Sequence, residues 1–311
     1  MTLTQPTPAD LADEHPLAAS AQNGFTERRI STNDSRQLYF RDYGDPMSPG
    51  TPILCLTGLA RNARDFHTLA SSLCHRHRVI CPDYIGRGKS DWADEWERYQ
   101  PPAMLGDILA LKTALNLHEC ILIGTSLGGF LTMGLAVLAP TFVKAAVIND
   151  VGPDFGSDAL DRIIDYVGRD HPQPNWDAAM QYLKAGFPQL GFEDEQDWVD
   201  MTEGSFVPGP DNQLHNSWDP KLAETLKDND HGFDLWALFR ALTPRPVLAF
   251  RGANSDALAA ETFERMAEIM PNMTAITVPN RAHTPTLGEP IARDAIVAFL
   301  DQVDGFRDES T

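Results

Sequence analysis

Short apolar runs alternate with stretches of helical spacing along most of this chain. The apolar runs predict buried strands at residues 52–57, 79–83, 120–125, 144–149, 246–250 and 274–278. The helical spacing predicts helices at residues 63–73, 104–115, 127–138, 259–270 and 291–303. Residues 25–32 and 37–43 are instead typical of an antiparallel pair joined by a polar turn. The repeated strand–helix units predict an α/β fold, with a mostly parallel twisted sheet and helices on both faces.

The alternation stops between residues 153 and 236. This stretch is rich in Asp, Pro and aromatic residues, and helical spacing returns at residues 159–167, 176–184 and 195–201. A structureless loop of this length would be unusual in a compact domain. We therefore expect a mainly helical cap at residues 153–236, inserted into a core of residues 25–152 and 237–311. Some of its aromatic side chains would line a substrate pocket, and others would form the interior of the cap.

The composition of the chain limits the classes of molecule that it is expected to bind. The 311 residues include 25 basic and 44 acidic side chains, a formal net charge of −19. This charge argues against nucleic acid and against an anionic membrane surface as partners. Residues 1–24 contain several prolines and acids but no basic or apolar segment of a secretory signal, so we expect a flexible arm there. The four cysteines show no metal-binding spacing, which favours a reduced, cytoplasmic location and no metal site.

The sequence Gly-Thr-Ser-Leu-Gly at residues 124–128 lies between an apolar run and a helical stretch. The pattern Gly-x-Ser-x-Gly at such a junction is a nucleophile elbow, in which a sharp turn exposes the Ser126 hydroxyl. The helix N-terminus behind it would present free N–H groups to a developing negative charge. The alternative is an ordinary strand-to-helix turn whose glycines serve packing alone.

Five stretches in this order resemble the α/β-hydrolase superfamily, and its capped serine esterase and lipase-like branch most of all. They are residues 56–62, 83–90, 124–128, 250–256 and 279–290. The resemblance implies an α/β-hydrolase fold and a catalytic triad of Ser126, Asp256 and His283. It also implies an oxyanion hole made by the backbone N–H groups of Leu59 and Leu127. Thr57 stands where the family usually carries a histidine.

The acid of the triad has two candidates. Asp256 matches the family's Gly-x-x-Ser-Asp pattern after a strand, and it could also cap the helix that follows. Asp150 is the rival, because it directly follows the strand at residues 144–149, a position that some relatives use. We prefer Asp256 on the motif.

The implied chemistry needs no cofactor. His283 would take the proton of Ser126 while Asp256 holds the imidazole tautomer, and attack on an ester would give an acyl-enzyme that water then hydrolyses. The expected partner is a small or medium, mostly uncharged ester-like molecule; the sequence does not predict an oligomeric state. Serine at the elbow disfavours epoxide hydrolases and haloalkane dehalogenases, which use aspartate there.

Several relatives share the same triad. A C–C bond hydrolase is weakened by Thr284, because those enzymes often place tryptophan after the histidine. Lactonase, thioesterase, amidase and acyl-transfer activities remain open, and so does a ligand-binding receptor without turnover.

Two further features have structural interpretations. The glycines of residues 83–90 have the wrong spacing for a phosphate loop, so we expect a turn beside the nucleophile in which Asp83 and Arg87 join a local polar network. Arg61 could meet a substrate carboxylate, but a salt bridge with Asp65 is favoured.

Overall fold

The computed structural model describes residues 24–154, 157–227 and 234–306, with the side chains of residues 157–161 left undescribed. The arm expected at residues 1–24 therefore lies outside the described residues, apart from its last residue.

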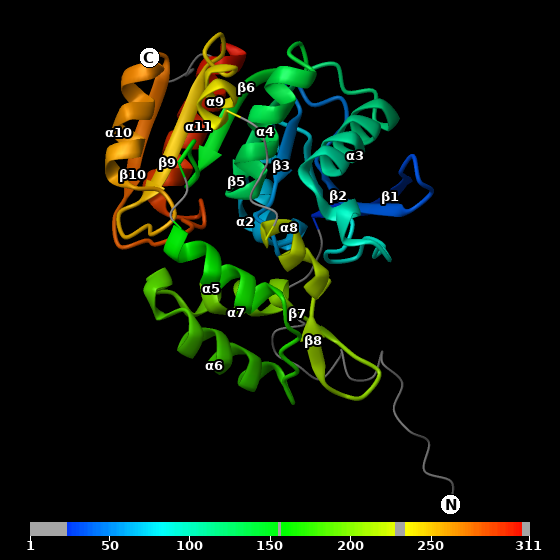
Figure 1. Ribbon diagram of the computed structural model, residues 1–311. Coiled ribbons are helices and arrows are strands. Elements are labelled where there is room, and N and C mark those ends of the chain that lie inside the picture. The colour runs from blue at the N-terminus through cyan, green and yellow to red at the C-terminus, as the bar shows by residue number, and fades with distance from the viewer. Residues whose placement is uncertain (1–23, 155–156, 228–233, 307–311) are drawn as a thin grey trace, which may run out of the picture.

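A single eight-stranded sheet organises the molecule (Figure 1). Its strands lie in the order β1 (Phe25–Ser31), β2 (Gln37–Tyr43), β4 (Val79–Pro82), β3 (Ile53–Leu56), β5 (Cys120–Thr125), β6 (Val143–Asn149), β9 (Val247–Gly252) and β10 (Met273–Val278). Strand β2 runs antiparallel to β1 and β4, and the remaining pairs are parallel. The predicted α/β fold with a mostly parallel sheet is confirmed.

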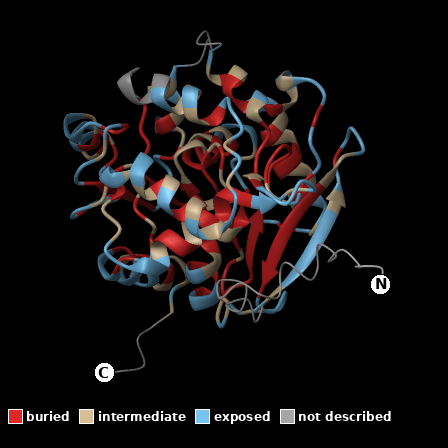
Figure 2. Cartoon of the chain, turned by 90° about the horizontal axis from the view of Figure 1, so that it is seen from below, coloured by how far each residue is buried: buried red, intermediate tan, exposed pale blue. Residues whose placement is uncertain are grey.

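Helices cover both faces of the sheet, which is why the central strands are buried almost throughout. One face packs against η2 (Ala63–Phe66), α2 (His67–Leu73) and α11 (Pro290–Asp304). The other packs against α3 (Pro101–Ala114), α4 (Leu127–Leu138), α9 (Leu235–Arg240) and α10 (Ala260–Ile269). Along β5, Ile121 and Ile123 join the first cluster while Leu122 joins the second, as the period of two in a strand requires. Figure 2 shows that the buried residues, in red, lie in the interior of the molecule, while exposed residues, in pale blue, lie on its outer helices and loops.

Residues 157–227, which we call the cap segment, leave the strand–helix alternation and lie below the sheet in Figure 1. The segment contains α5 (Ser157–Val167), α6 (Trp176–Gly186), η4 (Pro188–Leu190), α7 (Glu195–Ser205), β7 (Phe206–Pro208), β8 (Leu214–Asn216), η5 (Pro220–Ala223) and α8 (Glu224–Lys227). It has a hydrophobic cluster of its own that includes Leu183, Trp198 and Phe206. The three predicted helices are present. The hairpin β7–β8 was not predicted, because strands of three residues are too short for a periodic signal.

The cap segment is attached to the turn that follows β4 and its 3₁₀ neighbour η3 (Trp96–Tyr99). The N–H of Gly88 donates to the carbonyl of Ser217 (2.7 Å), and the N–H of Asp219 donates to the carbonyl of Gly86 (2.9 Å). The phenol of Tyr99 donates to the Asp219 carboxylate at 2.6 Å. These bonds place one end of the cap segment directly against the core.

Candidate active site

The turn at Ser126 has the strained geometry of the predicted elbow. Strand β5 ends at Thr125 and α4 begins at Leu127, and Ser126 between them has φ 51° and ψ −116°. This is a costly conformation for a residue with a side chain. The flanking glycines are needed because a Cβ on Gly124 would lie 2.4 Å from the carbonyl oxygen of Gly128, and one on Gly128 would lie 2.0 Å from that of Leu56. The turn is therefore too tight for side chains at Gly124 and Gly128, as the sharp turn predicted from the sequence requires.

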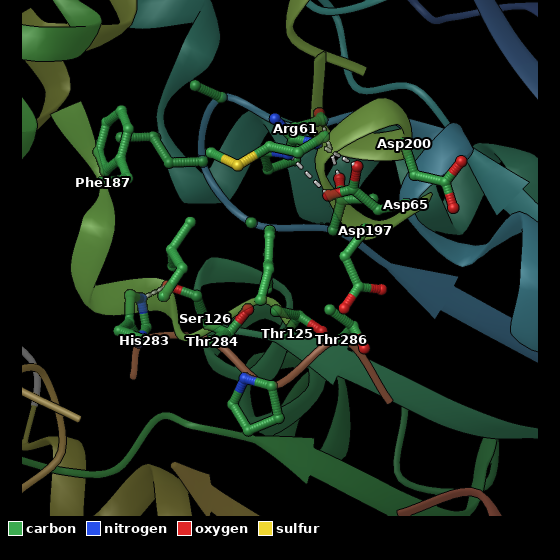
Figure 3. A pocket seen from close by; sticks show the side chains of 18 of the residues that line it. Arg61, Asp65, Thr125, Ser126, Phe187, Asp197, Asp200, His283, Thr284 and Thr286 are labelled. Carbon is green, nitrogen blue, oxygen red and sulfur yellow. Dashed lines mark hydrogen bonds and ion pairs between the residues drawn. The ribbon is translucent and has the colours of Figure 1, made fainter. Parts of the chain in front are cut away.

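Ser126 faces His283, which lies in the loop after β10. The Oγ of Ser126 is 3.0 Å from Nε2 of His283, and Figure 3 shows the two side chains together at one side of the pocket. The other ring nitrogen, Nδ1, is 2.8 Å from Oδ2 of Asp150. Because a carboxylate only accepts, Nδ1 carries the proton and donates it to Asp150. In this tautomer Nε2 carries no proton and can accept the hydroxyl proton of Ser126.

The preference for Asp256 as the carboxylate beside His283 was wrong. The Asp256 side chain is 39% exposed and forms an ion pair with Arg162 of α5. It is not the helix cap either, because the N-terminal cap of α10 is Ala259. The turn after β9 leaves Asp256 partly exposed at the cavity wall and away from His283, whereas Asp150 lies fully buried at the end of β6, the strand that pairs with β9.

Both carboxylate oxygens of Asp150 accept hydrogen bonds from the surrounding residues. The N–H of Gly252 donates to Oδ1 at 2.9 Å, and the hydroxyl of Ser255 donates to Oδ2 at 2.7 Å. The Ser255 oxygen in turn accepts from the N–H of Leu258 at 3.1 Å. Sequence reasoning missed Ser255 as a site residue, although it lies inside the quoted Gly-x-x-Ser-Asp pattern. The Gly-x-x-Ser-Asp motif, which suggested Asp256 as the acid, thus supplies through Ser255 a hydrogen-bond donor to Asp150, the acid that follows β6.

Asn149 joins the same region from the residue before Asp150. Its Nδ2 donates to the hydroxyl oxygen of Thr125 at 3.1 Å and to the carbonyl of Pro285 at 2.9 Å. The side chain therefore connects the elbow strand to the loop that carries His283. It was not identified from the sequence, because a buried asparagine at a strand end has no distinguishing pattern.

The loop after β3 lies beside the elbow. A Cβ placed on Gly58 would be 3.8 Å from the Cβ of Ser126, so the backbone at Leu59 passes close to the serine. Within the described part of the chain, the N–H groups of Leu59 and Leu127 donate to no backbone carbonyl. Both groups are thus available to an oxygen atom bound near Ser126, as an oxyanion hole requires.

A cavity of about 300 Å³ opens above Ser126 between the sheet and the cap segment. Its apolar walls include Phe187, Phe192 and Trp218 of the cap segment, and Leu69 of α2. Trp198, by contrast, is buried within the cap cluster. The aromatic residues are divided between pocket and cap interior, as we expected.

Charge in the cavity is mostly acidic. Among the lining residues, the acids are Asp65, Asp197, Asp200 and Asp256, and the arginines are Arg61 and Arg162. Figure 3 shows the first three acids grouped across the cavity from Ser126.

Both lining arginines are already paired with acids. Arg61 donates to both oxygens of Asp65 at 2.7 and 2.6 Å and to the Ser205 hydroxyl at 2.5 Å, which confirms the expected salt bridge. Burial raises the pKa of Asp197, although an ion pair with Arg281 opposes that shift. Among the described lining residues, both guanidinium groups are therefore bound to an acid, which leaves neither of them to pair with a substrate carboxylate.

Metal-ligand clusters and membrane-spanning helices are both absent from the described residues. In residues 24–154, 157–227 and 234–306, no group of three or more His, Cys, Asp and Glu side chains could hold a metal ion. The four cysteines are free thiols. No helix in these ranges is both long and apolar enough to cross a bilayer.

The chain is similar to known hydrolases over most of its length. A family model described as "alpha/beta hydrolase fold" matches residues 51–194. A 3-hydroxybutyrate-oligomer hydrolase of Cupriavidus necator is 33% identical over 285 residues, covering 88% of this chain and 96% of the relative. A 2-(acetamidomethylene)succinate hydrolase of Mesorhizobium japonicum is 25% identical over 296 residues, covering 94% and 98%.

The fold is also similar to that of a solved hydrolase structure. The crystal structure of an alpha/beta hydrolase from Novosphingobium aromaticivorans matches with a TM-score of 0.84 at 38% identity, covering 90% of this chain and 99% of the other. The shared architecture and the extent of the sequence matches lead to one conclusion. The chain is a hydrolase and belongs to the α/β-hydrolase family.

Proposed function

We propose that this protein is a serine hydrolase that cleaves carboxylic esters through an acyl-enzyme. The observation that carries the proposal is the continuous chain of contacts from Ser126 Oγ through His283 to Asp150, with distances of 3.0 and 2.8 Å. A serine hydroxyl is a weak nucleophile near neutral pH unless a base accepts its proton during attack. Here the nitrogen that would accept it lies at hydrogen-bond distance.

The reaction would proceed in two halves. Ser126 attacks the ester carbonyl while Nε2 of His283 takes the hydroxyl proton, and Asp150 stabilises the imidazolium that forms. The N–H groups of Leu59 and Leu127 receive the negative charge on the carbonyl oxygen. The imidazolium then donates its proton to the departing alcohol oxygen. In the second half, His283 deprotonates a water molecule that attacks the acyl-enzyme, and Ser126 is released.

We propose short oligoesters of hydroxy acids, such as 3-hydroxybutyrate oligomers, as the substrate class. The support is the 33% identity to a 3-hydroxybutyrate-oligomer hydrolase across 96% of that relative. The cavity of about 300 Å³ supports a short chain, since it is at the small end of ligand pockets. The cap segment would cover the bound chain and exclude water from it.

Electrostatics favours this class over a dicarboxylate. The cavity wall carries four acids and two arginines, and each arginine is paired with an acid. A succinate derivative, such as the one in the name of another relative, would bring two more negative charges against that wall. An oligoester brings only one carboxylate, at its end, so the bond to be cleaved can enter with the carboxylate kept outside.

The first test is ester hydrolysis with and without the nucleophile. Release of p-nitrophenol from p-nitrophenyl butyrate and cleavage of the 3-hydroxybutyrate dimer should both be lost in Ser126→Ala. Ser71→Ala is the matched control, because it removes the hydroxyl of an exposed serine on α2. A fluorophosphonate should add its phosphonyl group to Ser126 in the wild-type protein, as seen by peptide mass spectrometry. If folded protein forms no adduct and turns over neither ester, the esterase assignment is wrong and a ligand-binding role is favoured.

A further inference from the structure

Arg87 is a buried arginine that the proposed mechanism does not use. It lies in the turn after β4 with no exposed surface. No carboxylate of the described residues lies within salt-bridge distance of its guanidinium. Its charge lies instead against the rings of Tyr84 and Tyr99, 5.5 and 5.7 Å from their centroids. Burial lowers the pKa of Arg87 to about 10, so the guanidinium remains charged at neutral pH.

A buried charge with no carboxylate within salt-bridge distance is costly for folding, and the aromatic rings and the more distant carboxylate of Asp219 offset only part of that cost. The hydrogen bonds of the guanidinium show where the charge is directed. Nε donates to the carbonyl oxygen of Leu59 at 2.7 Å, and Nη1 donates to that of Ile85 at 2.8 Å. Nη2 has no acceptor among the described residues. The shorter of the two bonds thus holds Leu59, whose neighbour Gly58 lies close to the side chain of Ser126.

The same turn holds the loop at a second point. Oδ1 of Asp83 accepts the N–H of Ala63 at 2.7 Å, while its Oδ2 accepts the N–H of Lys89 at 2.8 Å. The loop after β3 is therefore held at the carbonyl of Leu59 and again at Ala63. The expected network around Asp83 and Arg87 is present, and its contacts converge on one loop.

The base of the Arg87 side chain is rigid as well. Its two neighbours bond to the cap segment, Gly88 to the carbonyl of Ser217 and Gly86 to the N–H of Asp219. Arg87 itself forms a backbone bridge with Trp218. Because the backbone is held on both sides, the guanidinium has little freedom to follow a displaced loop.

We infer that Arg87 is a positioning residue for the oxyanion hole, which it sets by holding the carbonyl of Leu59. The N–H and C=O of Leu59 flank one α-carbon, so a held carbonyl restricts the rotation that would turn the N–H away from the reacting oxygen. A charge-assisted bond does this more firmly than a neutral one. The inference rests on the proposed function, because it concerns the oxyanion of that reaction.

The test compares Arg87→Met with Arg245→Met. Arg245 also binds carbonyls, those of Val143 and Ala241 at 2.7 Å and that of Pro140 at 2.6 Å, but it lies at the opposite end of β6. For each variant, kcat and KM for p-nitrophenyl acetate are measured per active site, with sites counted by a fluorophosphonate end-point titration. The Ki of an alkyl boronic acid, which forms a tetrahedral adduct with serine, is measured in parallel.

Loss of an oxyanion donor costs about 10²–10³-fold in kcat, so a donor that is no longer held should cost about 10–100-fold. Arg87→Met should therefore lower kcat by that factor, leave KM within about 3-fold and raise the boronate Ki by a similar factor. Arg245→Met should change only the melting temperature. A merely structural Arg87 would give normal kcat and Ki in each titrated site, and that result would overturn the inference.

Arg87→Lys keeps the experiment decisive if the methionine variant does not fold. It retains the charge but replaces the planar Nε donor by a flexible ammonium group. We expect a smaller loss in kcat, about 3–10-fold, again matched by the boronate Ki. Unchanged kcat and Ki would reject the role of Arg87. Adduct formation at Ser126 in the wild-type protein separates this failure from failure of the proposed function.

Discussion

The replacement of Asp150 by Asn discriminates between the two candidate acids. In the wild-type protein, Oδ1 of Asp150 accepts the N–H of Gly252, and Oδ2 accepts both the Ser255 hydroxyl and Nδ1–H of His283. An asparagine has only one oxygen for these two positions. If that oxygen faces Gly252, the new NH₂ group faces His283 and forces the tautomer with the proton on Nε2. If it faces His283, the NH₂ group opposes the N–H of Gly252.

The first orientation removes the base, because a protonated Nε2 cannot accept the proton of Ser126. A wrong imidazole tautomer in a triad costs about 10⁴-fold in kcat, equivalent to about 5 kcal/mol of transition-state stabilisation. We expect a loss of this order in Asp150→Asn. Asp256→Asn makes the same chemical change in a carboxylate whose ion pair with Arg162 is exposed at both ends. Such pairs contribute at most about 1 kcal/mol, so its kcat/KM should stay within about 5-fold.

The assay is kcat/KM for p-nitrophenyl butyrate, normalised to sites titrated with a fluorophosphonate. Melting temperatures of both variants separate loss of folded protein from loss of chemistry. The reasoning is refuted if Asp256→Asn loses more than about 100-fold while Asp150→Asn remains within about 10-fold of wild type. Comparable losses in both variants would show that the ion pair with Arg162 also sets the geometry of the site.

Three other measurements test the fold and the electrostatics. Gly128→Ala should lower the free energy of unfolding in urea by more than about 3 kcal/mol, because its Cβ would lie 2.0 Å from a backbone oxygen of β3. Gly106→Ala, in open space on α3, should instead raise the free energy of unfolding by about 0.5–1 kcal/mol, and equal urea midpoints for the two variants would contradict this reasoning. The carboxylates of Asp170 and Asp211 bond to His215 and raise its pKa above 6.5, so the stability that these pairs contribute is present below pH 6.5 and is lost as pH rises through the folded pKa. His215→Gln should flatten this decline in the free energy of unfolding with pH, and an unchanged pH profile would contradict the prediction. The net charge of −19 and the acidic cavity wall should repel a substrate carboxylate, so KM for a free-acid 3-hydroxybutyrate dimer should decrease as salt is raised from about 20 to about 300 mM, whereas KM for its methyl ester should stay constant. The same salt dependence for both substrates would contradict electrostatic exclusion.

Local patterns in the sequence were sufficient for most of the fold. The strand at residues 120–125 and the helix at 127–138 are present with the predicted bounds, because apolar periodicity and flanking glycines act over a few residues. The elbow glycines follow from the same short-range sterics. Ser126 and His283 could be named as partners only through the resemblance to a family, since 157 positions separate them along the chain.

The tertiary structure alone decided which carboxylate meets His283. Asp150 and Asp256 both follow strands of the sheet, and no local signal separates the carboxylate that meets His283 from the one that pairs with Arg162. The choice depends on the pairing of β6 with β9, which places Asp150 against the N–H of Gly252, and on Ser255, which occupies the inward position of the next turn. The contact between Arg87 and Leu59 is of the same kind. Such contacts join segments that are distant in sequence, so their geometry exists only once the strands have found their neighbours.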